Sequence, residues 1–275
     1  MKNLKKSLIF FTSLIALITL AACSGSKSST NSDGTGSEKS GLDKIKSSKK
    51  LQVGVKQDVP NFGFKDPDTG KFSGMEIELA EMVAKDLGVE AVFTPVTAQT
   101  RGPLLDNNQI DIVAATFTIT DERKLTYNFT EPYFTDEAGF LVKKKNNFKS
   151  IKDLDGKNIG VAQSSSTKTN LEKLADENGI KFQYTELSDY PSLKLSLTAG
   201  RTDAFAVDKS ILSGYVDDQT EILDIGFAPQ KYGVATKKSN TELDDYINQL
   251  IAKWKNDGTM NKLYEKYNLK DASQK

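Results

Sequence analysis

The sequence predicts an α/β fold with mainly parallel sheets, and two observations support this fold class. Over residues 51–267, short apolar runs alternate with amphipathic stretches, as strands followed by helices do. Residues 102–111 and residues 195–203 both follow the order helix, loop, Asp, strand, and each strand ends at a polar tip, Thr116 or Asp208. The chain therefore resembles two similar α/β units.

The elements of the first half follow from local patterns. Residues 51–55 alternate as a strand, and residues 75–87 place apolar side chains at helical spacing. A turn is expected at 66–70, where Pro, Asp and Gly gather. Further elements are a strand at 89–95, a short helix at 103–108 and a strand at 110–115.

The second half repeats the same kinds of pattern. Strands are expected at 140–142, 158–162, 182–185, 203–207, 221–224 and 232–236. Helices are expected at 168–178, 191–199, 209–215, 243–254 and 260–267.

The N-terminal end has the pattern of an export signal. Residues 1–22 combine a lysine-containing head with an apolar run at 8–20, which is shorter than the roughly 20 residues of a membrane span. The sequence LAAC at 20–23 resembles the lipobox of bacterial lipoproteins, which implies cleavage before Cys23 and lipid on its sulfur. An ordinary cleaved signal or a free thiol is the alternative. Cys23 is the only cysteine, so no internal disulfide is expected.

Residues 23–44 are expected to form the lipidated cysteine and a flexible tether. Most of this segment is Ser, Gly, Thr, Asn and charged residues, which bury too little apolar area to offset chain entropy. A disordered tail without a function is the alternative. About 230 residues follow, which is enough for one large or two smaller domains.

Charge and composition exclude several function classes. Without residues 1–22 the chain has 34 basic and 37 acidic side chains, a net charge of −3. There is no basic stripe of the kind that nucleic-acid-binding proteins carry, so no nucleic-acid partner is expected. The chain has no histidine, which removes histidine bases and ligands and argues against an enzyme. Neither a cofactor nor a metal is expected.

The segment 111–124 combines the features of an anion site. A strand leads to Thr116 and Thr118, and Thr120 then begins a helix that carries Arg123 in its first turn. Peptide N–H groups and a guanidinium can together hold one carboxylate. A strand–helix junction with a surface arginine is the alternative. Other polar residues at expected strand ends, where α/β sheets bind ligands, are Lys56, Arg101, residues 164–167 and Asp208.

Eight short motifs occur in order along the chain. They are GMEIELA (74–80), IDIVA (110–114), TITDER (118–123), FTEPY (129–133), IKDLDG (151–156), GVAQS (160–164), GRTDA (200–204) and DGTM (257–260). With these motifs the chain resembles the polar amino-acid family of extracellular solute-binding proteins that serve ABC importers. Four more motifs resemble the aspartate- and glutamate-binding branch: KQDVP (56–60), TRGPLLD (100–106), DYPS (189–192) and AVDKS (206–210).

The resemblance implies a two-lobed, periplasmic-binding-protein-like (type II) fold that closes on its ligand. Lobe 1 would comprise residues 45–140 and 233–270, lobe 2 residues 141–232, and 271–275 would be a tail. The hinge crossings are then expected near Phe140 and Tyr232. The resemblance also implies a monomer on the extracellular face of the membrane, anchored by Cys23, with a membrane permease as partner.

A free amino acid presents a carboxylate and an ammonium group, and a buried site must pair both. The resemblance implies Arg123 as the α-carboxylate clamp and Asp208, with an oxygen of Thr116, as the α-ammonium partner. An N-cap of helix 209–215 is the alternative for Asp208. The clamp would be assisted by N–H groups of Thr118, Ser166 and Thr167.

We expect the ligand side chain to be bound by two cations and a phenol, namely Lys56, Arg101 and Tyr190. Together they suit a second carboxylate. The alternatives are solvated surface for Lys56, a loop charge for Arg101 and packing for Tyr190. Counting Lys56, Arg101 and Arg123 against Asp208 makes the pocket +2, which ranks an acidic ligand first, glutamine second and a basic ligand last. The aromatic packing typical of the family is poor here; Phe62 and Phe117 are possible substitutes.

The expected function is capture of glutamate or aspartate and delivery to an ABC importer. The same role for glutamine or another polar amino acid is the alternative. An enzyme resembling cyclohexadienyl dehydratase is a further alternative, which needs a general acid. Glu131 and Asp208 are the acids to consider for that role.

Overall fold

The computed structural model describes residues 41–274, which belong to one compact unit, Lys39–Lys275. The predicted signal peptide, the lipidation site at Cys23 and most of the predicted tether lie outside the described residues. Within residues 41–274, no helix combines the length and apolarity that crossing a membrane requires.

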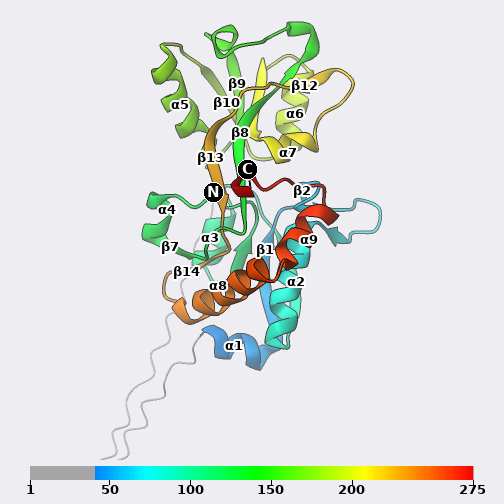
Figure 1. The fold of residues 1–275 in the computed structure, drawn as a ribbon, viewed down its shortest axis with the longest axis vertical. Helices are drawn as coiled ribbons and strands as arrows, with labels where there is room; N and C mark the ends of the chain where they lie inside the picture. The colour runs from blue at the N-terminus through cyan, green and yellow to red at the C-terminus, as the bar shows by residue number, and fades with distance from the viewer. Residues whose placement is uncertain (1–40, 275) are drawn as a thin grey trace, which may run out of the picture. The chain divides into compact units, whose positions relative to one another are not determined.

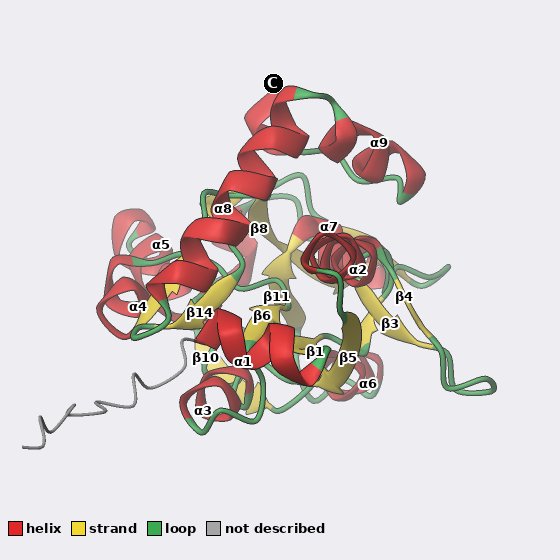
Figure 2. Cartoon of the chain, turned by 90° about the horizontal axis from the view of Figure 1, so that it is seen from below, coloured by secondary structure: helices red, strands yellow, loops and turns green. Residues whose placement is uncertain are grey.

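The first sheet has five strands within the described part of the chain, in the order β5-β1-β6-β14-β7. The central strand β1 runs parallel to β5 and β6, whereas β14 is antiparallel to β6 and β7. Figure 2 shows helices α1, α2, α3 and α8 around these strands. The strands are β1 (Lys50–Val55), β5 (Glu90–Pro95), β6 (Ile112–Ala114), β7 (Tyr127–Phe129) and β14 (Ala235–Lys237). The helices are α1 (Gly41–Ser48), α2 (Met75–Leu87), α3 (Arg101–Asp106), α4 (Asp121–Thr126), α8 (Thr241–Asn256) and α9 (Thr259–Lys266).

A small antiparallel sheet follows β1 and was not predicted. It consists of β2 (Asp58–Val59), β3 (Gly63–Lys65) and β4 (Phe72–Ser73). The loop between β3 and β4 contains the turn predicted at 66–70, in which Asp66 accepts hydrogen bonds from the N–H groups of Asp68 and Thr69.

The second sheet has the order β10-β9-β11-β8-β12 within the described residues, and β13 also pairs with β8. Strand β9 is parallel to β10 and β11, and β8 is antiparallel to β11, β12 and β13. The strands are β8 (Phe134–Lys143), β9 (Asn158–Ala162), β10 (Gln183–Leu187), β11 (Ala204–Asp208), β12 (Thr220–Ile222) and β13 (Phe227–Tyr232). The helices are α5 (Thr167–Asn178), α6 (Tyr190–Thr198) and α7 (Lys209–Ser213), with 3-10 turns at η1 (Lys144–Asn146), η2 (Ile151–Leu154) and η3 (Ala272–Gln274).

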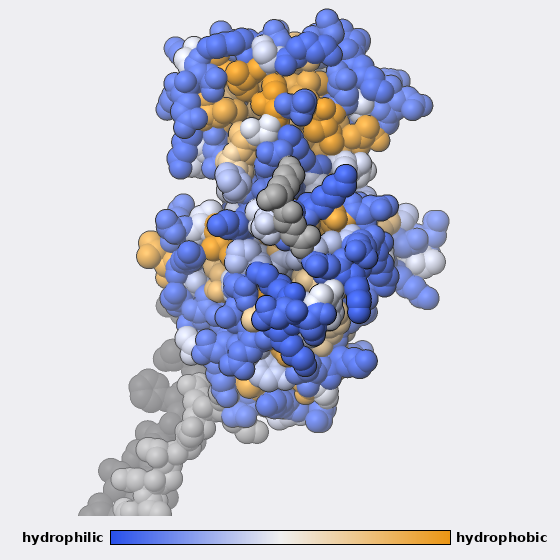
Figure 3. All heavy atoms as spheres, in the orientation of Figure 1, coloured by the Kyte–Doolittle hydropathy of each residue, from blue (hydrophilic) through white to orange (hydrophobic). Residues whose placement is uncertain are grey.

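We call the part built on the first sheet lobe 1 and the part built on the second sheet lobe 2. Figure 1 shows the two parts one above the other, with β8 and β13 running between them. In the same orientation, Figure 3 shows apolar residues gathered over lobe 2 and a largely hydrophilic face over α8 and α9.

The first change of sheet comes earlier than the expected crossing near Phe140. Phe140 pairs with Ala206 inside the second sheet, because β8 already begins at Phe134. The chain therefore leaves the first sheet after β7 and enters the second before Phe134. It returns between Tyr232, the last residue of β13, and β14.

The predicted tether to residue 44 is too long. Helix α1 begins at Gly41, and its residues Leu42 and Ile45 are buried. These side chains lie three positions apart, on one face of the helix, and α1 contacts α8. Packing against lobe 1, rather than helix length, therefore stabilises α1.

Aromatic rings fill the region where the two lobes join. Phe62 packs edge-on against Phe134 (centroids 5.2 Å apart) and against Tyr232 (5.7 Å). Phe134 stacks on Tyr232 at 5.9 Å and meets Tyr264 of α9 edge-on at 5.6 Å. Such pairs add stability beyond their area burial, so this cluster stabilises the strands that run between the lobes.

Candidate functional site

The predicted site residues lie at carboxyl ends of strands and at the helix starts that follow them. Lys56 follows β1, Thr116 follows β6, and Asp208 ends β11. Arg101 begins α3. Arg101 interacts electrostatically with several of the other charged groups, namely Lys56, Glu76, Arg123, Tyr190 and Asp208. The structure thus brings these side chains into one region between the lobes.

Arg123 is held between the lobes and is not a surface arginine. Thr120 caps α4 by accepting the Arg123 N–H at 3.1 Å, as the sequence predicts. The guanidinium donates to the carbonyls of Thr118 (2.8 Å) and, on lobe 2, Ser164 (3.2 Å). Burial, with Arg101 nearby, lowers the pKa of Arg123 to about 9. A partly buried guanidinium of this kind favours an anionic partner.

Thr118 and Ser166 converge on Gln230, which the sequence did not reveal. The hydroxyls of Thr118 and Ser166 donate to Gln230 Oε1 at 3.0 Å and 3.1 Å. Gln230 is buried on β13, whose pairing shifts register at Pro229. Thr167, the first residue of α5, is buried beside Ser166, so the start of this helix faces inward.

Thr116 has a left-handed backbone, with φ of 46°, which is uncommon for a residue other than glycine. Its N–H donates to Glu76 Oε1 at 2.6 Å, and its carbonyl accepts from Arg101 at 3.1 Å. Its hydroxyl is buried and has no hydrogen-bond partner among the described residues. Thr116 therefore has an unused polar group, as expected of a ligand contact.

Arg101 is 3% exposed, so it is not a loop charge in solvent. One guanidinium nitrogen donates to the carbonyls of Ala115 (2.6 Å) and Thr116 (3.1 Å), and the group lies 4.0 Å from the centroid of the Phe117 ring. Nε is buried without a partner among the described residues. Burial lowers the pKa of Arg101. Phe117 is thus an aromatic neighbour of the cations, whereas Phe62 belongs to the aromatic cluster between the lobes.

Lys56 is 2% exposed, which removes the solvated-surface alternative. Its ammonium is 3.0 Å from Asp58 Oδ1 and 4.4 Å from the centroid of the Tyr190 ring. Burial lowers the pKa of Lys56, while Asp58 acts in the opposite direction. Tyr190 is itself buried and presents its ring to a cation, so it does more than pack at a turn.

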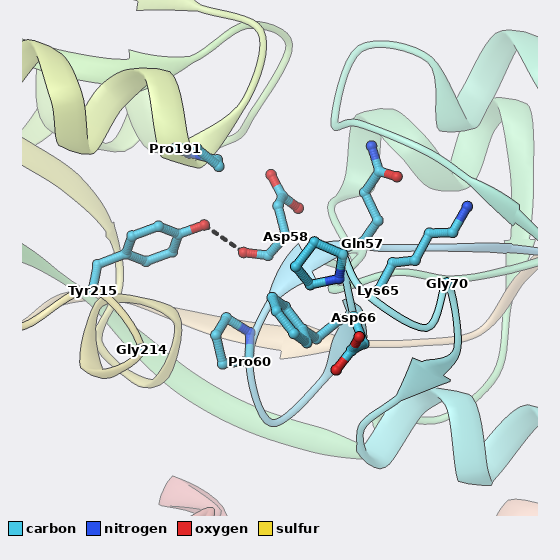
Figure 4. Close-up of a pocket in the computed structure, with 11 residues that line it drawn as sticks. Gln57, Asp58, Pro60, Lys65, Asp66, Gly70, Pro191, Gly214 and Tyr215 are labelled. Carbon is cyan, nitrogen blue, oxygen red and sulfur yellow. Dashed lines mark hydrogen bonds between the residues drawn. The ribbon is translucent and has the colours of Figure 1, made fainter.

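Asp58, which sequence reasoning missed, joins the lobes as well as pairing with Lys56. It lies in β2 on lobe 1, and its Oδ2 accepts the N–H of Tyr190 on lobe 2 at 3.3 Å. Its backbone carbonyl accepts the Tyr215 hydroxyl, as Figure 4 shows. A pocket of about 680 Å³ lies beside this link, lined by residues that include Pro60, Phe64, Pro191 and Tyr215.

A second pocket of about 630 Å³ lies beside Arg123. Thr120, Tyr127 and residues 164–166 are among the residues that line it. Neither pocket is lined by Arg101 or Asp208. Both groups are buried.

Asp208 is buried, and its carboxylate accepts a hydrogen bond from the Tyr232 hydroxyl. Burial, followed by the nearby charge of Asp136, raises the pKa of Asp208 to about 7. It occupies the N-cap position of α7 but makes no side-chain capping hydrogen bond. Its carboxylate is therefore available to a cationic ligand group.

Glu76 is the second residue that sequence reasoning missed. It is fully buried at the start of α2 and accepts hydrogen bonds from the Thr116 N–H and the Tyr133 hydroxyl. Burial raises the pKa of Glu76 to about 7, against the opposing influence of both hydrogen bonds and of Arg101 and Lys56. Asp58 and Glu76 add two acids to the sequence-based count, so the charge of the region depends on the protonation of Glu76.

Glu131, one of the two acids considered for an enzyme, lies away from this region. Its carboxylate pairs with Lys255 of α8 at 2.7 Å, and it is about one-third exposed. Within residues 41–274, no group of His, Cys, Asp and Glu side chains is arranged to hold a metal ion.

Comparison with known proteins supports the resemblance. The family model of bacterial extracellular solute-binding proteins, family 3, matches residues 51–270. The ABC transporter glutamine-binding protein GlnH of Bacillus subtilis is 37% identical over 268 residues, covering 95% of this chain and 96% of GlnH. The glutamate-binding protein GluB of Corynebacterium glutamicum is 28% identical over 230 residues, covering 78% and 76%.

A solved structure shows the same fold. The ancestral amino acid-binding protein AncCDT-1, a precursor of cyclohexadienyl dehydratase, superposes with a TM-score of 0.75 at 33% identity, covering 83% of this chain and 99% of that protein. The chain therefore has the two-lobed, periplasmic-binding-protein-like fold that the sequence predicts.

Proposed function

The chain belongs to the bacterial extracellular solute-binding proteins of family 3, and we propose that it captures glutamate or aspartate for an ABC importer. That it is an amino-acid-binding protein of such an importer follows from the family and its relatives. The choice of an acidic ligand rests on one observation: Lys56, Arg101 and Arg123 are brought together between the lobes, the first two almost fully buried.

Arg123 and Asp208 would hold the two groups common to all amino acids. The Arg123 guanidinium has donors beyond the two that it gives to Thr118 and Ser164, and these would bind the α-carboxylate. The N–H groups at the start of α5, Ser166 and Thr167, would assist. The α-ammonium would bind the Asp208 carboxylate and the unpartnered Thr116 hydroxyl.

Arg101, Lys56 and Tyr190 would bind the side-chain carboxylate. Arg101 Nε is buried and unpartnered, and an anion would satisfy both its charge and its free donor. Lys56 lies over the Tyr190 ring. A ligand carboxylate here would compete with Asp58 for Lys56, which couples ligand binding to a residue that contacts both lobes.

The charge balance depends on Glu76 and leaves glutamine as the second candidate. With Glu76 protonated, and Asp208 ionised by pairing with the ligand ammonium, the three cations exceed Asp58 and Asp208 by one, which matches the net −1 of an acidic amino acid. With Glu76 ionised, the balance is zero and matches neutral glutamine, the ligand named for the relative GlnH. Because burial raises the pKa of Glu76 to about 7, the protonated form is accessible near neutral pH.

Calorimetric titration of ligand-free protein with glutamate, aspartate, glutamine and arginine tests this proposal. Tight binding of glutamate or aspartate, with glutamine clearly weaker, supports it. Tight glutamine binding without an acidic response would replace the ligand while leaving the roles of Arg123 and Asp208 in place.

Delivery would follow from closure of the lobes. A ligand that contacts residues of both lobes stabilises the conformation in which they meet, and this form would dock on the permease as a monomer. Asp58, Arg123 and Thr118 already contact lobe 2 residues. We propose a binding protein without catalytic activity, because Glu131 is tied to Lys255 and Asp208 is assigned to the ammonium group.

Lipid on Cys23 would keep the protein at the extracellular face of the membrane. A membrane anchor raises the local concentration of the protein near its permease. Cys23→Ser should release the protein into the medium and abolish incorporation of labelled palmitate. Unchanged membrane association of Cys23→Ser would refute the anchor.

A further inference from the structure

We propose that Glu76 determines which ligand charge the site accepts, by taking up a proton when an acidic amino acid binds. This inference rests on the proposed function, because it concerns the side-chain carboxylate of glutamate or aspartate. It assigns a role in specificity to a carboxyl group that would not itself touch the ligand.

The two oxygens of the Glu76 carboxyl group lie in different environments. Oε1 accepts the Thr116 N–H and the Tyr133 hydroxyl, so one oxygen is fully engaged. Oε2 is buried and has no hydrogen-bond partner among the described residues. An ionised carboxylate with one unpaired, buried oxygen is costly, and its main compensation is the charge of nearby cations.

Several titratable groups interact with Glu76. They come from four segments: Lys56 after β1, Arg101 on α3, Tyr133 ahead of β8 and Tyr190 on α6. The two cations favour the ionised form and burial favours the protonated form, with the result that the pKa is raised to about 7. Glu76 is therefore poised between two protonation states near neutral pH.

Binding of an acidic ligand would change the charges around Glu76. A side-chain carboxylate bound by Arg101 and Lys56 offsets the same two cations that favour ionised Glu76, and it adds a negative charge. Both effects raise the pKa of Glu76 further. Above pH 7, where Glu76 is mostly ionised in the ligand-free protein, binding must then take up a proton, and affinity must fall as pH rises. Glutamine has no second carboxylate and has no such effect.

Asp208 also titrates near pH 7, and its contribution must be separated. Pairing with the ligand ammonium favours ionised Asp208, so binding releases a proton at and below pH 7. This release is common to glutamate and glutamine, and it fades above pH 7, where Asp208 is already ionised. Comparing the two ligands at pH 8 therefore removes the contribution of Asp208. Burial lowers the pKa of Lys56, which can also gain a proton when it pairs with the ligand carboxylate, so the comparison with a Glu76 variant is needed to isolate Glu76.

The test is proton counting by calorimetry at pH 8, in phosphate and in Tris, which differ in ionisation enthalpy. The ligands are L-glutamate, L-aspartate and L-glutamine. The variant is Glu76→Gln, which keeps an oxygen for the Thr116 N–H but cannot titrate. Glu78→Gln is the matched control, because it makes the same change on α2 at a residue that pairs with Lys266 outside the site.

Wild type and Glu78→Gln should take up a fraction of a proton, approaching about one, with each acidic ligand and none with glutamine. Their affinity for glutamate should fall by up to about tenfold per pH unit above pH 7, and Glu76→Gln should show neither effect. Glutamate binding without proton uptake, or equal uptake by Glu76→Gln, would overturn the role of Glu76. If Glu76→Gln does not fold, absence of a glutamate-specific proton uptake in the wild type still overturns the role of Glu76. Absence of any glutamate binding would instead overturn the proposed function together with this inference.

Discussion

Replacing Arg101 by methionine should separate acidic ligands from glutamine. Methionine keeps much of the length and apolar bulk of the side chain but removes the buried guanidinium and its unpartnered Nε. If Arg101 pairs with the side-chain carboxylate, its loss leaves a desolvated ligand charge that only Lys56 can offset.

The magnitude follows from the burial of this pair. Removing one partner of a buried, hydrogen-bonded charge pair costs about 2–5 kcal/mol. Affinity for glutamate should therefore fall by roughly 30-fold to several thousand-fold. The amide of glutamine carries no charge, and its affinity should change by less than about tenfold.

Calorimetric titration of wild type and Arg101→Met with both ligands measures this difference. Arg201→Met is the matched control, because Arg201 is exposed and the same change there should leave both affinities unaltered. Thermal unfolding checks that the variant folds, since the carbonyls of Ala115 and Thr116 lose a donor. An equal loss for glutamate and glutamine, or no loss for either, would refute the assignment of Arg101.

Three further predictions concern the common clamp, the link between the lobes and the pH dependence of stability. Asp208→Asn should weaken the binding of every amino-acid ligand. The wild-type affinity for glutamine should fall as pH drops below 7, because burial raises the pKa of Asp208 to about 7 and only its ionised form pairs with ammonium. A pH-independent affinity for glutamine would contradict this role. Tyr215→Phe removes the hydrogen bond to the Asp58 carbonyl, which is worth about 1 kcal/mol and links the lobes. Ligand dissociation, measured by surface plasmon resonance, should therefore become roughly fivefold faster. An unchanged dissociation rate would show that this hydrogen bond does not hold the lobes together. Burial raises the pKa of Glu76 above its unfolded value, so the folded protein binds more protons than the unfolded chain between about pH 4 and 7. The melting temperature of the ligand-free protein should therefore fall as pH rises across that range, and it should fall less steeply in Glu76→Gln. Identical slopes for the two proteins would contradict the burial of an acid at this position.

Local patterns predicted those parts of the site that depend on a few neighbouring residues. Thr120 caps α4 because a hydroxyl at that position reaches the N–H three residues on. Lys56 and Asp208 lie at strand ends, as predicted, because the alternation of strands and helices determines where such ends fall. The helix predicted at 103–108 begins earlier, at Arg101, so the pattern did not place Arg101 at a helix start.

The residues that were missed depend on segments that are distant in sequence. Glu76 is one of two acids in the first turn of an amphipathic helix, where a solvent-exposed acid is equally compatible with the pattern. Its burial comes from the Thr116 loop and from Tyr133, which lie 40 and 57 residues away. Gln230 was missed because Pro229 and a shift in register interrupt the strand pattern of β13.

The charge of the pocket could not be counted from the sequence for the same reason. The count of +2 used the residues at strand ends and omitted Asp58 and Glu76, whose positions depend on the small sheet and on the start of α2. It also assumed full ionisation, whereas burial places the pKa values of Glu76 and Asp208 near 7. Site charge is a property of the folded arrangement.

The most direct test of the central claim is a calorimetric titration of ligand-free wild type, at pH 7, with glutamate, aspartate and glutamine. Two buried cations facing a second carboxylate, Lys56 and Arg101, predict that glutamate or aspartate binds at least roughly 100-fold more tightly than glutamine. Glutamine binding as tightly as either acid, or more tightly, would contradict the claim that this site is built for an acidic amino acid.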